Sequence, residues 1–185
     1  MSSSVNKSVK AVRALIYLLI IAALVAFDQI TKYLAVVKLK GLEPYILIPD
    51  VLEFRYLENQ GAAFSMLQNK QTVFYILTAV FLVVAIFILR KIPKSRRFYP
   101  MIICLLVLCA GAVGNLIDRI IHRYVVDFIY FSVIDFPIFN VADIYVTLSV
   151  IFLIILVLFR YKDEDFDFIR KKHKQEKERV KEGDD

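Results

Sequence analysis

Four long apolar runs constrain this chain more than any other feature of its sequence. They extend over about residues 12–33, 73–89, 98–116 and 139–159. A helix needs about 20 apolar residues to cross the hydrocarbon core of a bilayer, and each run approaches that length. Because 59% of the 185 residues are hydrophobic, the chain is also more apolar than a soluble domain requires. The sequence therefore predicts an all-α membrane protein with four transmembrane helices.

The first run follows several basic residues, among them Lys7 and Lys10, and resembles a signal peptide in that respect. Three further runs follow it, however, and no soluble domain does, so we expect it to remain as a membrane anchor. We expect one membrane domain over residues 1–162 and a charged tail over residues 163–185.

Basic residues indicate how the spans are oriented, because Lys and Arg collect on the cytoplasmic side of membrane proteins. The N-terminus, the tail and the link between the second and third runs are rich in them, and this link holds Arg90, Lys91, Lys94, Arg96 and Arg97. The connections at about 34–72 and 117–138 hold fewer over a greater length. We therefore expect cytoplasmic termini and two outward connections.

The formal net charge of +6 does not indicate a nucleic-acid partner. From Arg160 onward the tail contains nine basic and nine acidic residues, which cancel. The excess positive charge lies beside the membrane spans, where the orientation rule explains it.

The first outward connection contains two β-rich stretches, residues 45–48 and 51–57, joined by Pro49-Asp50. Short apolar or alternating runs separated by turn residues are typical of paired strands. We expect a small β-rich subdomain over about residues 43–67 on the outer membrane surface.

Ionisable side chains in a span cost about 2.5–3.5 kcal/mol each, so every one needs a reason. In the orientation above they share one membrane level, at the outward ends of three spans or just beyond. They are Asp28 and Lys32, then Asp118 and Arg119, then Asp127, and finally Asp143, and the polar amides Asn115 and Asn140 lie at the same level. This convergence predicts a polar site near the outer face.

Some of these charges have a structural explanation as ion pairs, for instance Asp28 with Lys32 at i, i+4 spacing or Asp118 with Arg119. Asp127 and Asp143 instead lie among apolar residues with no adjacent basic partner. Two neighbouring carboxylates do not both ionise cheaply, so one keeps a proton while the other acts as a base. Such a pair is equipped to activate water.

Five blocks of the sequence resemble the lipoprotein signal peptidase family, also called signal peptidase II. In chain order they are residues 27–32 (FDQITK), 59–65 (NQGAAFS), 111–119 (GAVGNLIDR), 125–128 (VVDF) and 136–143 (FPIFNVAD). Any one block alone is weak, but the five in this order are highly specific. One slight departure is Ala110 before Gly111, where the family commonly has a second glycine.

The resemblance implies an aspartic endopeptidase whose catalytic residues are Asp127 and Asp143. It further implies site-supporting or substrate-binding roles for Asp28, Lys32, Asn59, Gly61, Asn115, Arg119, Asn140 and Ala142. Asp118 remains a rival acid, since the sequence does not exclude it. No metal and no cofactor are expected.

The implied substrates are prolipoproteins whose cysteine already carries a diacylglyceryl group, cut on the amino side of that cysteine. The implied location is the bacterial cytoplasmic (inner) membrane, with the active site near the outer face. We expect contacts with membrane lipids and a monomeric protein.

Two other classes of membrane protein share some of these sequence features with a peptidase. A small transporter or proton channel also uses membrane carboxylates, but a relay usually spreads them through the membrane depth. A membrane thiol oxidoreductase needs a Cys-x-x-Cys pair, whereas Cys104 and Cys109 are five positions apart in mid-span. Motifs of serine and metal peptidases, such as Gly-x-Ser-x-Gly and His-Glu-x-x-His, are absent from the sequence.

Overall fold

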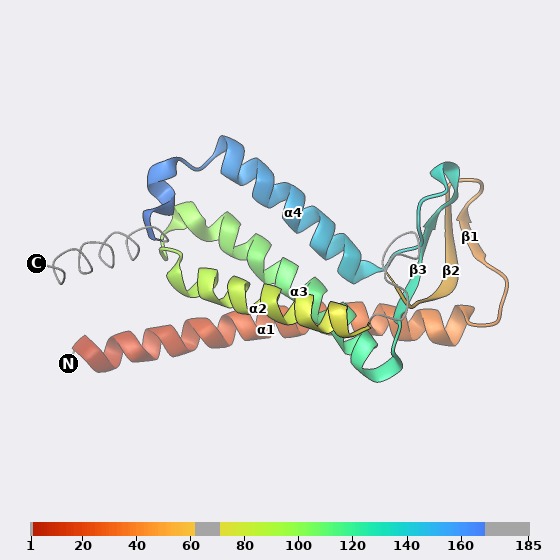
Figure 1. The fold of residues 1–185 in the computed structure, drawn as a ribbon, viewed down its shortest axis with the longest axis horizontal. Helices are drawn as coiled ribbons and strands as arrows, with labels where there is room; N and C mark the ends of the chain where they lie inside the picture. The colour runs from red at the N-terminus through yellow and green to blue at the C-terminus, as the bar shows by residue number, and fades with distance from the viewer. Residues whose placement is uncertain (1, 62–70, 169–185) are drawn as a thin grey trace, which may run out of the picture.

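The computed structural model describes residues 2–61 and 71–168. Within this part of the chain, four long helices and three strands are formed. They are α1 (Ser2–Leu39), β1 (Tyr45–Ile48), β2 (Leu52–Asn59), α2 (Gln71–Lys91), α3 (Tyr99–His122), β3 (Val125–Phe131) and α4 (Val141–Phe159). The helices run alongside one another, with the sheet at one end and the start of α1 and the end of α4 at the other (Figure 1). This arrangement confirms the predicted fold class.

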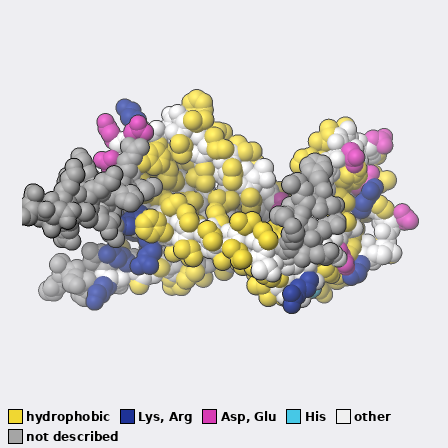
Figure 2. All heavy atoms as spheres, viewed as in Figure 1, with side chains coloured by type: hydrophobic (Ala, Val, Ile, Leu, Met, Phe, Trp, Pro, Cys, Tyr) yellow, Lys and Arg dark blue, Asp and Glu magenta, His cyan; other side chains and the backbone are white. Residues whose placement is uncertain are grey.

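All four helices are long and apolar enough to cross a membrane. Large apolar side chains on their outward surfaces are exposed, among them Leu18 (64%), Val83 (68%) and Leu158 (67%). In Figure 2 apolar side chains cover the flank of the helices, while the coloured charges lie mainly toward the two ends. Such a surface is suited to lipid rather than water.

Helices α1, α2 and α3 extend beyond the predicted runs. The third was expected to end near residue 116 but continues to His122, where Arg123 adopts a left-handed conformation with φ 68°. In the sequence, the charges of Asp118 and Arg119 directly follow the apolar run and so resemble the end of a membrane-spanning helix. They do not end the helix, because both side chains find polar partners at the sheet end of the bundle.

The sheet is antiparallel with strand order β1-β2-β3. Strands β1 and β2 confirm the predicted β-rich segment, although the part of it at residues 62–67 lies outside the described residues. Strand β3 comes from the connection between α3 and α4, and the sequence pattern did not predict it. It pairs with β2 through such partners as Leu57 with Asp127 and Asn59 with Val125.

An apolar cluster attaches this sheet to the C-terminal part of α1. Val126 and Phe128 of β3 are buried there with Ala35 of α1. Side chains alternate between the two faces of a strand, so Asp127 points away from this cluster. The contact between α1 and the sheet thus determines where the Asp127 carboxylate is held.

Two glycines of α3 allow the helices to approach closely at the level of the polar residues. A Cβ on Gly111 would lie 2.6 Å from the backbone oxygen of Ala142 in α4. A Cβ on Gly114 would lie 2.5 Å from Asp28 Oδ2 in α1. The absence of both side chains therefore makes room for the polar groups of α1 and for the first turn of α4.

At the opposite end, the start of the charged tail packs against the bundle. Arg97 donates to both carboxylate oxygens of Asp165, at 2.8 and 2.5 Å, and the rings of Phe98 and Tyr161 stack with centroids 5.4 Å apart. The first residues of the expected charged tail, 163–168, thus contact the bundle, because apolar Phe166 and Phe168 join this cluster. Residues 169–185 lie outside the described part.

Candidate active site

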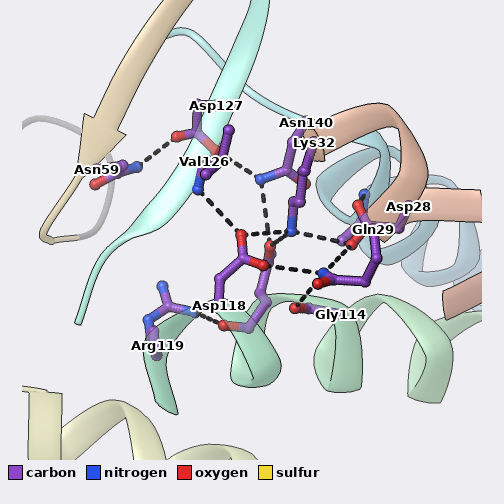
Figure 3. Close-up of polar contacts among 12 residues, drawn as sticks. Asp28, Gln29, Lys32, Asn59, Gly114, Asp118, Arg119, Val126, Asp127 and Asn140 are labelled. Carbon is purple, nitrogen blue, oxygen red and sulfur yellow. Dashed lines mark hydrogen bonds and ion pairs between the residues drawn. The ribbon is translucent and has the colours of Figure 1, made fainter. Parts of the chain in front are cut away.

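The polar residues predicted from the sequence meet at the sheet end of the helix bundle (Figure 3). They come from α1, α3, α4, β2 and β3, and several are almost completely buried. The buried charged or amide side chains are Asp28, Lys32, Asp118, Asp127 and Asn140. Groups more than a hundred positions apart in the sequence thus form one connected cluster.

Lys32 is the cation of this cluster. Its Nζ lies 3.0 Å from Asp28 Oδ2 and 3.0 Å from Asp118 Oδ2, and it donates to Asn115 Oδ1 at 2.9 Å. The three contacts match the three donors of an ammonium group. The predicted pair of Asp28 with Lys32 is confirmed.

The alternative pair of Asp118 with Arg119 is wrong. Adjacent residues of a helix do not face each other, so the two side chains diverge. Asp118 turns to Lys32, whereas Arg119 donates to the carbonyl oxygen of Asn115 at 3.3 Å. The Arg119 guanidinium also lies 4.4 Å from the centre of the Phe74 ring, a cation–π contact.

The carboxylates of Asp28 and Asp118 also join other elements. Asp28 Oδ1 accepts from the backbone nitrogen of Ala142 at 2.9 Å, and Asp118 Oδ2 accepts from that of Val126 at 3.0 Å. The predicted site residue Ala142 therefore acts through its backbone. These contacts attach α4 and β3 to the Lys32 cluster.

Gln29 is a site residue that the sequence pattern did not single out. Its Nε2 donates to Asp28 Oδ2 at 3.1 Å, to Asp118 Oδ1 at 2.9 Å and to the carbonyl oxygen of Gly114 at 3.2 Å. The only signal in the sequence was its place in the 27–32 block, because an uncharged amide beside Asp28 does not stand out by itself.

Asp127 is held by two amides. Asn59 Nδ2 donates to its Oδ2 at 2.7 Å and Asn140 Nδ2 to its Oδ1 at 2.6 Å. Asn59 is oriented in turn by the backbone nitrogen of Gly61, which donates to its Oδ1 at 3.0 Å. Burial and then the neighbouring Asp143 raise the pKa of Asp127 to about 7, although the two amides act in the opposite direction.

Asp143 lies in the first turn of α4, where it forms a reciprocal cap with Asn140. The Asp143 backbone nitrogen donates to Asn140 Oδ1 at 3.0 Å, and the Asn140 backbone nitrogen donates to Asp143 Oδ2 at 3.2 Å. Asn115 Nδ2 donates to the other oxygen, Oδ1, at 2.8 Å. Asn140 therefore contacts both Asp127 and Asp143.

The four acids of the cluster fall into two kinds. Asp28 and Asp118 share the ammonium of Lys32. Within the described part of the chain, neither Asp127 nor Asp143 forms an ion pair, and neutral amides surround both. Two such carboxyl groups in each other's electrostatic range can share one proton and act as an acid and a base.

A metal site finds no support in this arrangement. Among the described residues, no group of three or more His, Cys, Asp or Glu side chains is placed to hold a metal ion. Two carboxyl groups held by neutral amides are suited to proton transfer.

Comparison with known proteins gives a consistent result. A family model described as signal peptidase (SPase) II matches residues 20–159. A lipoprotein signal peptidase of Clostridium tetani is 41% identical over 147 residues, which are 76% of this chain and 91% of the relative. One from Caldanaerobacter subterraneus is 41% identical over 144 residues, 77% of this chain and 96% of the relative.

Solved structures of bacterial membrane enzymes are also similar to this chain. One, at 2.3 Å resolution, has 38% sequence identity and a TM-score of 0.69, covering 77% of this chain and 87% of its own. A second, at 1.9 Å, has 37% identity and a TM-score of 0.68, covering 78% and 94%. The helices and sheet described above thus have experimentally determined counterparts.

Replacing Lys32 by Met is expected to destabilise the protein strongly. The substitution leaves the carboxylates of Asp28 and Asp118 buried without their cation, and breaking a buried ion pair in this way costs about 3–5 kcal/mol. The measurement is thermal unfolding of the purified protein in detergent. Lys40→Met is the control, because Lys40 forms an exposed pair with Glu58 and its loss should change little. Equal unfolding temperatures for the two variants would contradict the central role given to Lys32.

Proposed function

Because the chain belongs to the signal peptidase II family, we propose that Asp127 and Asp143 are the catalytic pair with which it removes signal peptides from prolipoproteins. Membership makes the protein a multi-pass bacterial membrane peptidase. The observation that carries the choice of residues is that these two acids, linked through Asn140, have neutral amides as partners.

Asp118 is the less suitable acid on the same criterion. It lies 3.0 Å from the Lys32 ammonium and accepts hydrogen bonds from Gln29 and from the backbone of Val126. Its carboxylate is thus already engaged by a cation and by two N–H donors, as in a structural ion pair. Asp28 shares the same cation. Both therefore serve as supports of the pair.

In the proposed reaction, one aspartate of the pair takes a proton from water as the water oxygen attacks the scissile carbonyl carbon. The other, protonated, donates to the developing oxyanion. The carbon–nitrogen bond then breaks, and the leaving amine of the cysteine takes up a proton from the pair. No covalent bond to the enzyme is formed.

Asn59, Asn115 and Asn140 orient the two acids in this scheme. Each donates a side-chain N–H to one of them, at distances of 2.6–2.8 Å. Such donors stabilise the ionised form, while burial favours the neutral one. The amides of Asn59 and Asn140 thereby offset part of the effect of burial on the pKa of Asp127.

For the substrate, we propose a precursor with a diacylglyceryl-modified cysteine, cut on the amino side of that cysteine. The lipid remains in the bilayer beside the apolar flanks of the helices, and the peptide reaches the pair near the membrane surface. The sheet lies beside the pair, because Asp127 and Asn59 are part of it. The protein acts as a monomer with membrane lipids around it.

For the orientation, we propose that both termini and the α2–α3 connection are cytoplasmic and that the sheet and the pair lie at the outer face. The basic residues Arg90, Lys91 and Lys94 at the end remote from the sheet support this assignment. Residues 1–162 form the membrane domain, and residues 163–185 form a cytoplasmic tail.

Asp127→Asn and Asp143→Asn are each expected to lower cleavage by about 10²–10⁴-fold, because each removes one partner of an acid–base pair. Asp118→Asn should keep appreciable activity. The assay measures cleavage of a synthetic precursor peptide with a diacylglyceryl-modified cysteine by purified protein whose folding is verified. The matched control is Asp135→Asn. Asp135 is an exposed acid that follows β3, the strand that contains Asp127. An inactive Asp118→Asn together with an active Asp127→Asn would assign the reaction to Asp118 and Asp143.

The cleavage rate should fall as pH rises through about 7. The pKa of Asp127 is raised to about 7, so below this pH the pair holds the proton it needs, and above it the proton is lost. Asn59→Ala removes a hydrogen bond that lowers this pKa, so it should move the fall to higher pH. The measurement is kcat against pH for both proteins. A shift to lower pH in Asn59→Ala would count against this role of the pair.

The orientation predicts opposite labelling of two introduced cysteines. In a background where Cys104 and Cys109 are replaced by Ala, Val133→Cys near the sheet should react with a membrane-impermeant maleimide in intact cells. Ser95→Cys between α2 and α3 should react only after lysis. Both positions are exposed. The reverse labelling pattern would mean that the protein has the opposite orientation in the membrane.

A further inference from the structure

A pocket of about 770 Å³ lies between the sheet end of α1 and the sheet, outside the cluster of catalytic acids. Its volume is within the range of about 300–1,000 Å³ that is usual for small-molecule sites. The lining is apolar over most of its extent and includes Ala35, Leu39, Pro44, Tyr45, Phe54 and Phe128. Such a lining is suited to a hydrocarbon chain.

The sheet separates this pocket from the catalytic pair. Phe128 lines the pocket, and Asp127 precedes it in β3. Consecutive side chains of a strand point to opposite faces. A molecule in the pocket therefore lies behind the strand that carries Asp127 and does not reach the scissile bond.

Two charges of opposite sign complete the lining, Lys38 at the end of α1 and Glu43 in the following loop. Both are exposed. Neither side chain forms a hydrogen bond or an ion pair with another of the described residues. Nearby Lys40, in contrast, is paired with Glu58 at 2.8 Å.

We propose that this pocket binds one zwitterionic glycerophospholipid from the leaflet on the sheet side of the membrane. An acyl chain occupies the apolar interior, the phosphate lies near Lys38 and the headgroup ammonium lies near Glu43. An anionic lipid would present no cation to Glu43, so the pair of opposite charges selects a zwitterionic headgroup. The position at the outer end of a membrane-spanning helix places the site where lipid headgroups are found.

Filling the pocket should remove the bound lipid. Leu34 lines the pocket and is 48% exposed, whereas Val37, on the same helix and 53% exposed, does not line it. Leu34→Trp and Val37→Trp therefore form a matched pair. Delipidated full-length protein in detergent is titrated with phosphatidylethanolamine and followed by native mass spectrometry. We expect one tightly bound lipid in wild type and Val37→Trp, and none in Leu34→Trp.

Changing one charge of the rim should change the headgroup preference. Glu43→Lys is expected to weaken phosphatidylethanolamine binding about tenfold, the effect of losing one hydrogen bond to a charged group, and to strengthen phosphatidylglycerol binding. Lys10→Glu, at the other end of α1, is the control and should change neither affinity.

Three results would overturn the proposal. The first is equal lipid binding by Leu34→Trp and Val37→Trp, which indicates only a lipid layer around the helices. The second is an unchanged headgroup preference in Glu43→Lys. The third is a raised KM of Leu34→Trp for the diacylglyceryl peptide, which would assign the pocket to the substrate. Cleavage by wild type is measured in parallel, so a failure of the proposed function is distinguished from a failure of the lipid site.

Discussion

The contact of Lys32 with two buried carboxylates is the interaction on which the rest of the structure depends. It joins α1 to α3 through Asp28 and Asp118, and these acids accept from the backbones of α4 and β3. Buried charges of this kind are tolerated only when each has a partner and its remaining oxygens are hydrogen-bonded. Three helices and the sheet therefore meet at one ammonium group.

This use of Lys32 leaves the proposed catalytic pair without an ion-pair partner among the described residues. Asp127 and Asp143 receive hydrogen bonds from asparagine amides, which orient a carboxyl group without fixing its charge. Asn140 has a double task, because it caps α4 and also donates to Asp127. The start of α4 and the position of the Asp127 carboxylate are thus both set by one side chain.

The sequence predicted the elements better than their contacts. The spans, strands β1 and β2, and the cluster of polar residues are visible in local pattern, because hydropathy and turn residues act over a few positions. Strand β3 was missed because its partner is about seventy positions away in β2. The pairing of Asp118 was also misjudged, since sequence neighbours such as Arg119 are not spatial neighbours on a helix. The contacts of Gln29 depend on the close approach of α1 and α3, which no local pattern specifies.

The length of α1 has a mechanical consequence. Its 38 residues at about 1.5 Å each extend about 57 Å, whereas a bilayer core is about 30 Å thick. The sheet is attached to this helix by an apolar cluster at Ala35. A helix longer than the bilayer core is accommodated by tilting or by extending into the headgroup region. The height of the Asp127 carboxylate above the hydrocarbon therefore depends on the tilt of α1 as well as on the fold.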